Sequence, residues 1–392
     1  MQTGSREPET LRALNRRLMH MQYLSRVASG PHSPVTAAEA TCGVNSQDFG
    51  ESFLSFWARV ERFADSSLHS ELRPKGGLVR TWTVRGTMHI FPSKDYHVHV
   101  FGSPRKRILL RYDNAARRRG IPLGDARVHS LYLPLLDDIK GRAVTSAYIA
   151  DFISNRLTRM GLKGRRRMVR GWSSRPTIGP SWVGVTEMSY LGLLVNAGRK
   201  GSESLWMRTA DWLSAGRGVP EPETCVVELV RKFIRNYGPV SRADILYWSY
   251  LLSREVGASI STLKRDLVEE RVEGSKETYY SFEGAPKDAC EPQGATVLPE
   301  FDSLMMGYRD KSRFLSPDRT KQVFRPLGMV SPTVLIDGFV AATWRKKRER
   351  NRMTVSVLPL RELAARERRS IEERFSQLGD YLGTSLEAKV PA

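Results

Sequence analysis

The segment 221–284 most narrowly limits what this chain can fold into, because it specifies three short helices followed by a hairpin. Apolar residues recur at helical spacing over 226–237, with a proline near the start and a glycine just past the end. A second helix is predicted to begin at Ser241, an N-cap residue with Asp244 in its first turn. A third is predicted near 259–267, and the residues after it alternate around a Gly-Ser-Lys turn. This order predicts a winged helix-turn-helix.

The same order of elements recurs more weakly in two other parts of the chain. In 128–213, helices are predicted near LYLPLLDDI, TSAYIADFISNRL and SWVGVTEMSYLGLLVNAG, and the strand-like ESLWMRTADWL follows them. In 11–100, helices at the start and at Phe49–Val60 precede the strand-rich LVRTWTVRGTMHIFP. We therefore expect two further winged-helix copies in tandem.

Beyond residue 291 the pattern changes to strands. Asp337-Gly338 lies between two apolar strands, which is a hairpin signal, and MTVSVLPL adds another strand. These strands predict a small antiparallel β-barrel or sheet, and 361–382 predicts a charged amphipathic helix. The predicted fold class is α+β, with tandem winged-helix (helix-turn-helix) domains followed by a small C-terminal antiparallel β-barrel and a terminal helix. The predicted domains are 1–115, 116–216 and 217–290, each with one winged helix, and 291–392, with the barrel and helix.

The charge balance indicates a polyanionic partner. The chain has 392 residues, and its 62 Lys and Arg outnumber 42 Asp and Glu to give a net charge of +20. Nucleic acid and a membrane surface both fit such an excess. The sequence has no run of about 18 apolar residues and no apolar signal-peptide core, so we expect a cytoplasmic protein that does not insert into a membrane.

The cysteines and histidines do not indicate a metal site. Cys42, Cys225 and Cys290 are odd in number and widely spaced, which is typical of a reduced compartment and not of a disulfide framework. The seven histidines, among them His97 and His99, lack zinc-ligand spacing. We expect neither a metal nor a cofactor.

Three basic clusters carry the excess charge: Arg117–Arg119, Lys163–Trp172 and Arg345–Arg352. Each alone is more often a solvated surface than a binding site. Together with winged helices they favour a nucleic-acid surface over a membrane surface, because Gly, Arg and Trp in one loop suit phosphate contact with aromatic stacking. The candidate DNA contacts in the second and third clusters are Arg165, Arg166, Arg167, Arg170, Arg345, Lys346 and Lys347.

A polar step, Asn45-Ser46-Gln47-Asp48, comes directly before the predicted helix Phe49–Val60. Asp48 stands at the N-cap position, and it would be a cap even in an inert protein. Asn45 and Gln47 are not needed to cap this helix. Two amides at i and i+2 of an extended step point the same way, so they are predicted to hold one water molecule together.

The stretch RTWTVRGTMHIF supplies a second candidate surface. If it is one continuous strand, Arg85, Thr87 and His89 share a face, and Gly86 is the point where it could bend. His89 is either a satisfied buried histidine or a functional one, and Arg85 is either a phosphate or carboxylate clamp or a catalytic group. Arg85 and His89 are accordingly candidate DNA-binding residues.

Four motifs in collinear order resemble the AlkZ/YcaQ-like winged-helix DNA glycosylases, which include enzymes that unhook interstrand crosslinks. They are CGVNSQDFGESFLSFWARV, GGLVRTWTVRGTMHIFPSKDY, LPEFDSLMMGYRDKS and SPTVLIDGFVAATWR, and the resemblance runs over about 11–385. It implies tandem winged helices with a C-terminal β-barrel, and hydrolysis of the N-glycosidic bond of alkylated purines, chiefly N7-alkylguanine. The family signature is Gln-x-Gln or Gln-x-Asp. Here Gln47 matches the second Gln, Asn45 replaces the first, and Ser46 stands where the family has an apolar residue.

The resemblance implies a catalytic set of Asn45, Gln47 and Asp48, with the amides positioning water and Asp48 polarising it or offsetting positive charge on the sugar. We expect a monomeric, monofunctional DNA glycosylase that acts on double-stranded DNA with alkylated bases, including bulky or crosslinked adducts. The alternative is a winged-helix DNA-binding protein or regulator without catalytic activity, such as a catalytically retired paralogue. Charge and winged helices fit both hypotheses, so the 45–48 step and the resemblance discriminate between them.

Overall fold

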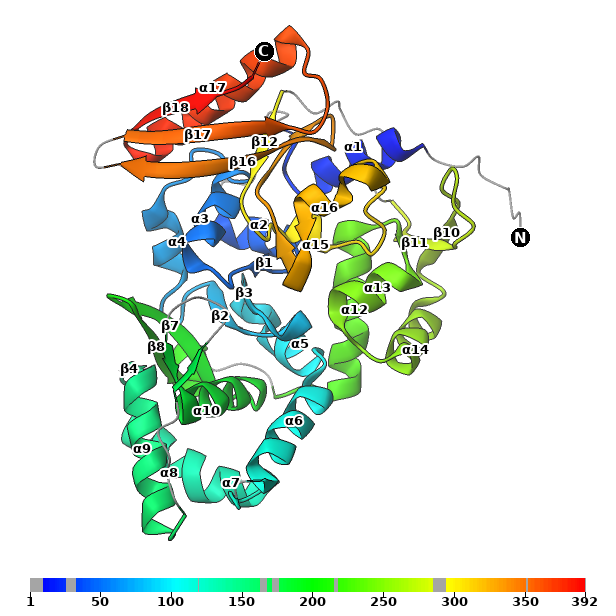
Figure 1. Cartoon of the computed structure of the whole chain (residues 1–392). Helices are drawn as coiled ribbons and strands as arrows, with labels where there is room; N and C mark the ends of the chain where they lie inside the picture. Colours follow the sequence, from blue (N-terminus) through cyan, green and yellow to red (C-terminus); the bar gives the residue numbers. More distant parts are fainter. Residues whose placement is uncertain are drawn as a thin grey trace. The chain divides into compact units, whose positions relative to one another are not determined.

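The computed structural model describes residues 10–25, 33–118, 120–162, 168–170, 176–214, 218–284, 294–349 and 352–391 (Figure 1). The chain divides into two compact units. One consists of Met1–Leu68 and Val230–Ala392, and the other is His69–Leu229. The finer division into four domains stays a prediction. Over the described residues, no helix is both long and apolar enough to cross a membrane.

The first unit begins with short helices that lead into the polar step. Asp48 is the N-cap of α3, as predicted, and the helix ends at Trp57, three residues earlier than expected. Leu54, Phe56 and Trp57 are buried, so the apolar face of α3 anchors the helix behind its exposed N-terminus. The elements are α1 (Leu11–Met21), α2 (Pro34–Ala40), β1 (Val44–Asn45), α3 (Phe49–Trp57) and α4 (Asp65–Glu71).

The three helices and the hairpin predicted within 221–284 are present. Ser241 and Asp244 form a reciprocal capping box at the start of the second helix, because each side chain bonds the other residue's backbone N–H. The third helix begins at Ser253, earlier than predicted. Strands β10 and β11 are antiparallel, and β9 adds a third strand. The elements are α12 (Pro222–Tyr237), β9 (Val240–Ser241), α13 (Arg242–Ser249), α14 (Ser253–Leu263), β10 (Leu267–Glu270) and β11 (Tyr279–Phe282).

The C-terminal strands form a curled half-barrel in the order β12-β15-β16-β17-β18, not a closed antiparallel barrel (Figure 1). The predicted terminal helix is present, but β18 follows it and pairs parallel with β17, which makes the sheet mixed. Asp337 and Gly338 form the β15–β16 turn with positive φ at both positions, as a two-residue hairpin requires. The elements are β12 (Thr296–Leu298), α15 (Ser303–Met306), α16 (Thr320–Val323), β13 (Phe324–Arg325), β14 (Met329–Val330), β15 (Thr333–Ile336), β16 (Phe339–Glu349), β17 (Arg352–Pro359), α17 (Ala365–Leu382) and β18 (Ser385–Lys389).

The second unit is built on strands that neighbour one another in the order β3-β2-β7-β8-β4. The continuous strand considered around Gly86 is wrong, because Arg85 and Gly86 both have positive φ and turn the chain into the β2–β3 hairpin. The helix expected over SWVGVTEMSYLGLLVNAG ends at Tyr190, and the residues after Gly192 form β7. The strands are β2 (Leu78–Trp82), β3 (Met88–Pro92), β4 (Val144–Thr145), β5 (Met168–Arg170), β6 (Pro176–Ile178), β7 (Leu194–Lys200) and β8 (Glu203–Arg208); the helices are α5 (Tyr96–Phe101), α6 (Arg105–Arg117), α7 (Gly124–Arg127), α8 (Leu133–Asp138), α9 (Ser146–Arg159), α10 (Gly179–Tyr190) and α11 (Thr209–Trp212).

Candidate functional site

The polar step turns sharply and does not stay extended. The Asn45 side-chain oxygen Oδ1 accepts a hydrogen bond from the Gln47 backbone N–H at 3.2 Å. This local turn holds the Asn45 side chain against the backbone, where Asn45 is only 8% exposed, whereas Gln47 is exposed. The Asn45 oxygen thus bonds the chain itself, and the expectation that the two amides hold one water molecule together stays a prediction.

Asp48 acts as the cap of α3. Its Oδ1 accepts from the Gly50 N–H at 2.8 Å and the Glu51 N–H at 3.4 Å. One carboxylate oxygen is thus committed to the helix N-terminus. The structural role predicted for this residue is confirmed.

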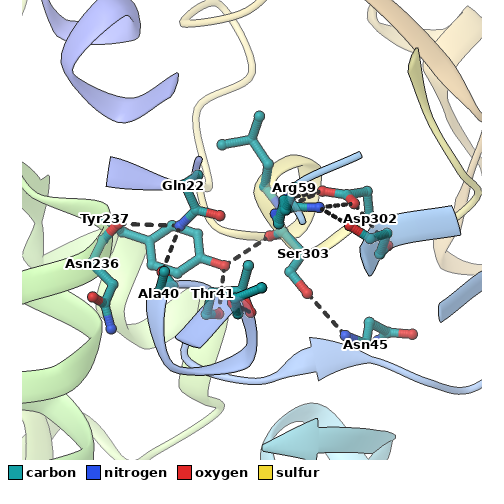
Figure 2. A network of polar contacts seen from close by, with 12 residues as sticks. Gln22, Ala40, Thr41, Asn45, Arg59, Asn236, Tyr237, Asp302 and Ser303 are labelled. Atoms are coloured by element: carbon teal, nitrogen blue, oxygen red, sulfur yellow. Dashed lines mark hydrogen bonds and ion pairs between the residues drawn. The ribbon is translucent and has the colours of Figure 1, made fainter. Parts of the chain in front are cut away.

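Ser303 fixes the step from the side of α15. Its hydroxyl donates to the Gly43 carbonyl at 3.1 Å and accepts from the Asn45 N–H at 2.9 Å. Figure 2 shows Ser303 between Asn45 and the Tyr237 hydroxyl, which donates to the Thr41 carbonyl at 2.9 Å. A single hydroxyl therefore satisfies two buried backbone groups that flank Val44 and sets the position of the step.

A buried ion pair joins α3 to the loop before α15 (Figure 2). Arg59 Nη2 lies 2.7 Å from Asp302 Oδ1, Arg59 Nη1 lies 2.8 Å from Asp302 Oδ2, and neither side chain has exposed surface. Asp302 also accepts from the Ser55 hydroxyl at 2.8 Å and from the Leu304 N–H at 3.0 Å. Because both carboxylate oxygens are bonded, the loop that carries Ser303 is held against α3 in one arrangement.

Charged side chains from three other segments surround the start of α3. Lys346 Nζ, on β16, lies 2.5 Å from Glu51 Oε1 in the first turn of α3. Glu300 follows β12, and its Oε1 lies 3.8 Å from Arg325 Nη2 on β13. The pKa of Glu300 is raised above its ordinary value, chiefly by burial and next by the negative charge of Glu51, while Arg325 and Lys346 act in the opposite direction. The negative charge of Asp48 also raises the pKa of Glu300, less than that of Glu51 does.

The family model for DNA glycosylase AlkZ-like proteins matches residues 38–381, which include the step and the loop that holds it. The chain belongs to this AlkZ-like family. It is 23% identical over 313 residues to an interstrand DNA cross-link repair glycosylase of Streptomyces sahachiroi, and the aligned region covers 77% of this chain and 79% of that protein. The solved structure of the Streptomyces sahachiroi DNA glycosylase AlkZ matches with a TM-score of 0.77 at 19% identity, over 98% of this chain and 100% of that one. The structural match shows the fold, and the family match makes DNA the substrate class of the family.

The other predicted DNA contacts of this AlkZ-like chain fall in different places. Lys346 is beside the step, through Glu51, while Arg345 and Lys347 project from the opposite face of β16 and are exposed. Arg165, Arg166 and Arg167 lie outside the described residues, and Arg170 is described only as part of the backbone of β5.

Arg85 and His89 both belong to the second unit, but they differ in exposure. Arg85 is partly exposed in the β2–β3 turn. His89 is 5% exposed and contacts the Thr87 carbonyl through Nδ1 at 3.3 Å. Burial is the largest of the effects that lower the pKa of His89 to about 3, so the ring is neutral at physiological pH. This favours the alternative of a satisfied buried histidine.

Sequence reasoning did not single out Glu51, Glu300 and Ser303, although all three adjoin the step. Glu300 and Ser303 stand in the quoted motif LPEFDSLMMGYRDKS, and Glu51 stands in CGVNSQDFGESFLSFWARV. A polar residue in a motif was the available signal, but Ser303 lies 258 positions from Asn45, and Glu51 lies 295 positions from Lys346. Among the residues that the structure describes, no group of three or more His, Cys, Asp or Glu side chains is arranged to hold a metal ion.

Proposed function

We propose that this chain is a monofunctional DNA glycosylase that hydrolyses the N-glycosidic bond of alkylated purines, with N7-alkylguanine as the principal lesion. The observation that carries the proposal is the exposed residue Gln47, whose backbone N–H is held by the Asn45 side chain just before α3, the helix in whose first turn Glu51 pairs with Lys346. The family match over 38–381 supports it, because the step lies within the matched region.

The chemistry suits a site built from an amide. An N7-alkylated guanine is cationic and leaves as a neutral base, so no general acid is needed. The remaining tasks are to place water against C1′ and to stabilise positive charge on the sugar. The Gln47 amide can position water, and the carboxylates at the start of α3 offset the developing cation.

The ion pair at the step supports a monofunctional reaction. Schiff-base chemistry with the abasic sugar needs a neutral lysine amine. Lys346 is a lysine beside the step, and its Nζ is engaged by the Glu51 carboxylate at 2.5 Å, so it is not available as a nucleophile in this arrangement. The proposed product is therefore an intact strand that carries an abasic site.

We propose that the three predicted winged helices and the exposed cations of β16 bind DNA. Arg345 and Lys347 offer two charges on one face of that strand. Contacts of this kind are made with the phosphate backbone and do not depend on the base sequence. The Streptomyces sahachiroi relative is described as an interstrand cross-link repair glycosylase, and we extend this proposal to bulky and crosslinked N7 adducts on that basis.

The test is release of free 7-methylguanine from a defined duplex by wild type, by Gln47→Ala and by the matched control Gln322→Ala. Gln322 is another exposed glutamine of the same unit. Wild type and the control should release base, with strand cleavage only after alkali, and Gln47→Ala should lose at least about 10²-fold in rate. Equal rates for all three proteins would refute the assignment of Gln47, and cleavage without alkali would refute a monofunctional reaction.

The second candidate is a DNA-binding protein without activity. The replacement of the first signature glutamine by Asn45, whose oxygen is bonded to the backbone, favours it. Such a protein should bind undamaged and alkylated duplexes equally and release no base, whereas a glycosylase should prefer lesion or abasic DNA.

A further inference from the structure

The proposed hydrolysis produces a proton that the amide step cannot take up. As the C1′–N9 bond breaks, its electron pair neutralises the cationic base; as water forms the new O–C1′ bond, it must lose a proton. Carboxamides do not accept protons at physiological pH, so Asn45 and Gln47 can orient the water but cannot deprotonate it. A base is required within reach of the same water.

Two of the three carboxylates near the step are engaged elsewhere. Asp48 uses Oδ1 to cap α3. Glu51 forms the short ion pair with Lys346. Glu300 is different, because its ion-pair partner, Arg325 Nη2, lies 3.8 Å away, beyond hydrogen-bond distance.

The chain around Glu300 is held firmly. The next residue, Phe301, has φ of 57°, a conformation that a bulky residue adopts only under tertiary constraint. Asp302 is then locked by Arg59, and Ser303 by Gly43 and Asn45. Glu300 is thus three residues from the hydroxyl that bonds the Asn45 backbone, on a loop with little freedom to move.

We propose that Glu300 is the general base that removes the proton from the attacking water while the Gln47 amide positions that water. The proton passes from water to the Glu300 carboxylate, the water oxygen bonds C1′, and the base leaves with the C1′–N9 electron pair. This inference rests on the proposed glycosylase function and adds the residue that completes its proton balance.

The electrostatic surroundings suit this role. Partial burial and the charges of Glu51 and Asp48 raise the pKa of Glu300, and Arg325 and Lys346 limit the rise. A carboxylate whose pKa is raised towards the working pH is a stronger base that is still deprotonated. The charged neighbours thus come from the start of α3, from β13 and from β16.

The experiment measures the pH profile of single-turnover release of 7-methylguanine. Glu300→Gln should lower the rate by about 10²- to 10⁴-fold and abolish the fall in rate at low pH. The matched control is Glu387→Gln, since Glu387 has a similar exposure and also pairs with an arginine, Arg352, at a different place in the unit. It should keep both the rate and the profile of wild type.

Two neighbouring variants test the role without touching Glu300. Arg325→Met removes a charge that lowers the Glu300 pKa, so the acid limb should move to higher pH; Glu51→Gln removes a charge that raises it, so the limb should move to lower pH. A wild-type rate and limb for Glu300→Gln, or shifts of the same sign in both neighbours, would overturn the inference. Absence of base release by wild type would instead overturn the proposed function. If Glu300→Gln does not fold, as judged by its melting curve, the opposite shifts of the acid limb in Arg325→Met and Glu51→Gln decide whether Glu300 is the base.

Discussion

The buried ion pair between Arg59 and Asp302 gives the sharpest stability prediction. Replacing Arg59 by Met preserves the length of the side chain but leaves the Asp302 carboxylate inside the protein without its charge partner. Both side chains have no exposed surface, and the pair is bidentate at 2.7 and 2.8 Å. Removing one partner of such a pair costs about 3–5 kcal/mol, because a buried charge is left uncompensated.

The double variant separates this cost from lost packing. Arg59→Met with Asp302→Leu removes both charges, so the remaining losses are the α15 cap, about 1 kcal/mol, and the Ser55 hydrogen bond, about 1 kcal/mol. The double variant should therefore be more stable than Arg59→Met alone. Its rate of base release should nevertheless fall, because the cap that orients Ser303 is gone.

Urea unfolding of wild type and variants measures these differences. Arg12→Met is the matched control, since Arg12 is 59% exposed and pairs with Asp337 at 3.0 Å at the surface. It should change the free energy of unfolding by at most about 1 kcal/mol. The reasoning is refuted if Arg59→Met is no more harmful than Arg12→Met, or if the double variant loses as much as the two single variants added together.

Three further predictions concern other parts of the molecule. Gly338→Ala should cost at least about 1 kcal/mol and more than Gly274→Ala, since both have positive φ but only Gly338 has a neighbour, Asn15 Cβ, 2.8 Å from the added methyl; equal losses by urea unfolding would contradict the close contact. His89→Phe should reduce acid destabilisation: a histidine with a folded pKa of about 3 against 6.5 unfolded withdraws stability as pH falls below 6.5, about 3 kcal/mol by pH 4. The comparison of unfolding free energies at pH 7 and pH 4 checks this, and an unchanged difference would argue against a buried neutral ring. Arg345→Gln with Lys347→Gln should flatten the slope of log K against log salt for duplex binding by about 2, whereas an unchanged slope would show that β16 makes no phosphate contacts.

Local chemistry explains why much of the fold followed from the sequence. The Ser241 cap with Asp244 in the first turn, the Asp48 cap and the Asp337-Gly338 turn are each decided by residues within four positions of one another, and all were predicted correctly. The structure adds that Ser241 and Asp244 cap each other reciprocally. The sequence left a small antiparallel β-barrel or sheet open and the structure has a curled half-barrel, because whether a sheet closes depends on pairing between strands far apart in sequence. The parallel strand β18, which returns after α17, carries no local signature that distinguishes it from an antiparallel one.

The candidate site shows the same division. The sequence marked Asn45, Gln47 and Asp48 because they adjoin a helix start, and it identified the cap correctly. It could not show that Glu51 meets Lys346, because this contact spans 295 positions. Long-range polar contacts leave no periodic pattern in the sequence, so only the folded structure shows them.

The turn at Asn45 changes how the amide signature should be understood in this chain. A glutamine at this position would carry its amide one methylene further from the backbone, whereas the Asn45 oxygen reaches back to the Gln47 N–H at 3.2 Å. Asparagine readily makes this turn because its short side chain mimics a backbone carbonyl two residues away. Asn45 then serves to shape the backbone at Gln47, the exposed residue whose amide we propose to position the water. Because the Asn45 amide is used to shape the backbone, a separate carboxylate is needed to accept the proton. Glu300 has this role in the proposed reaction.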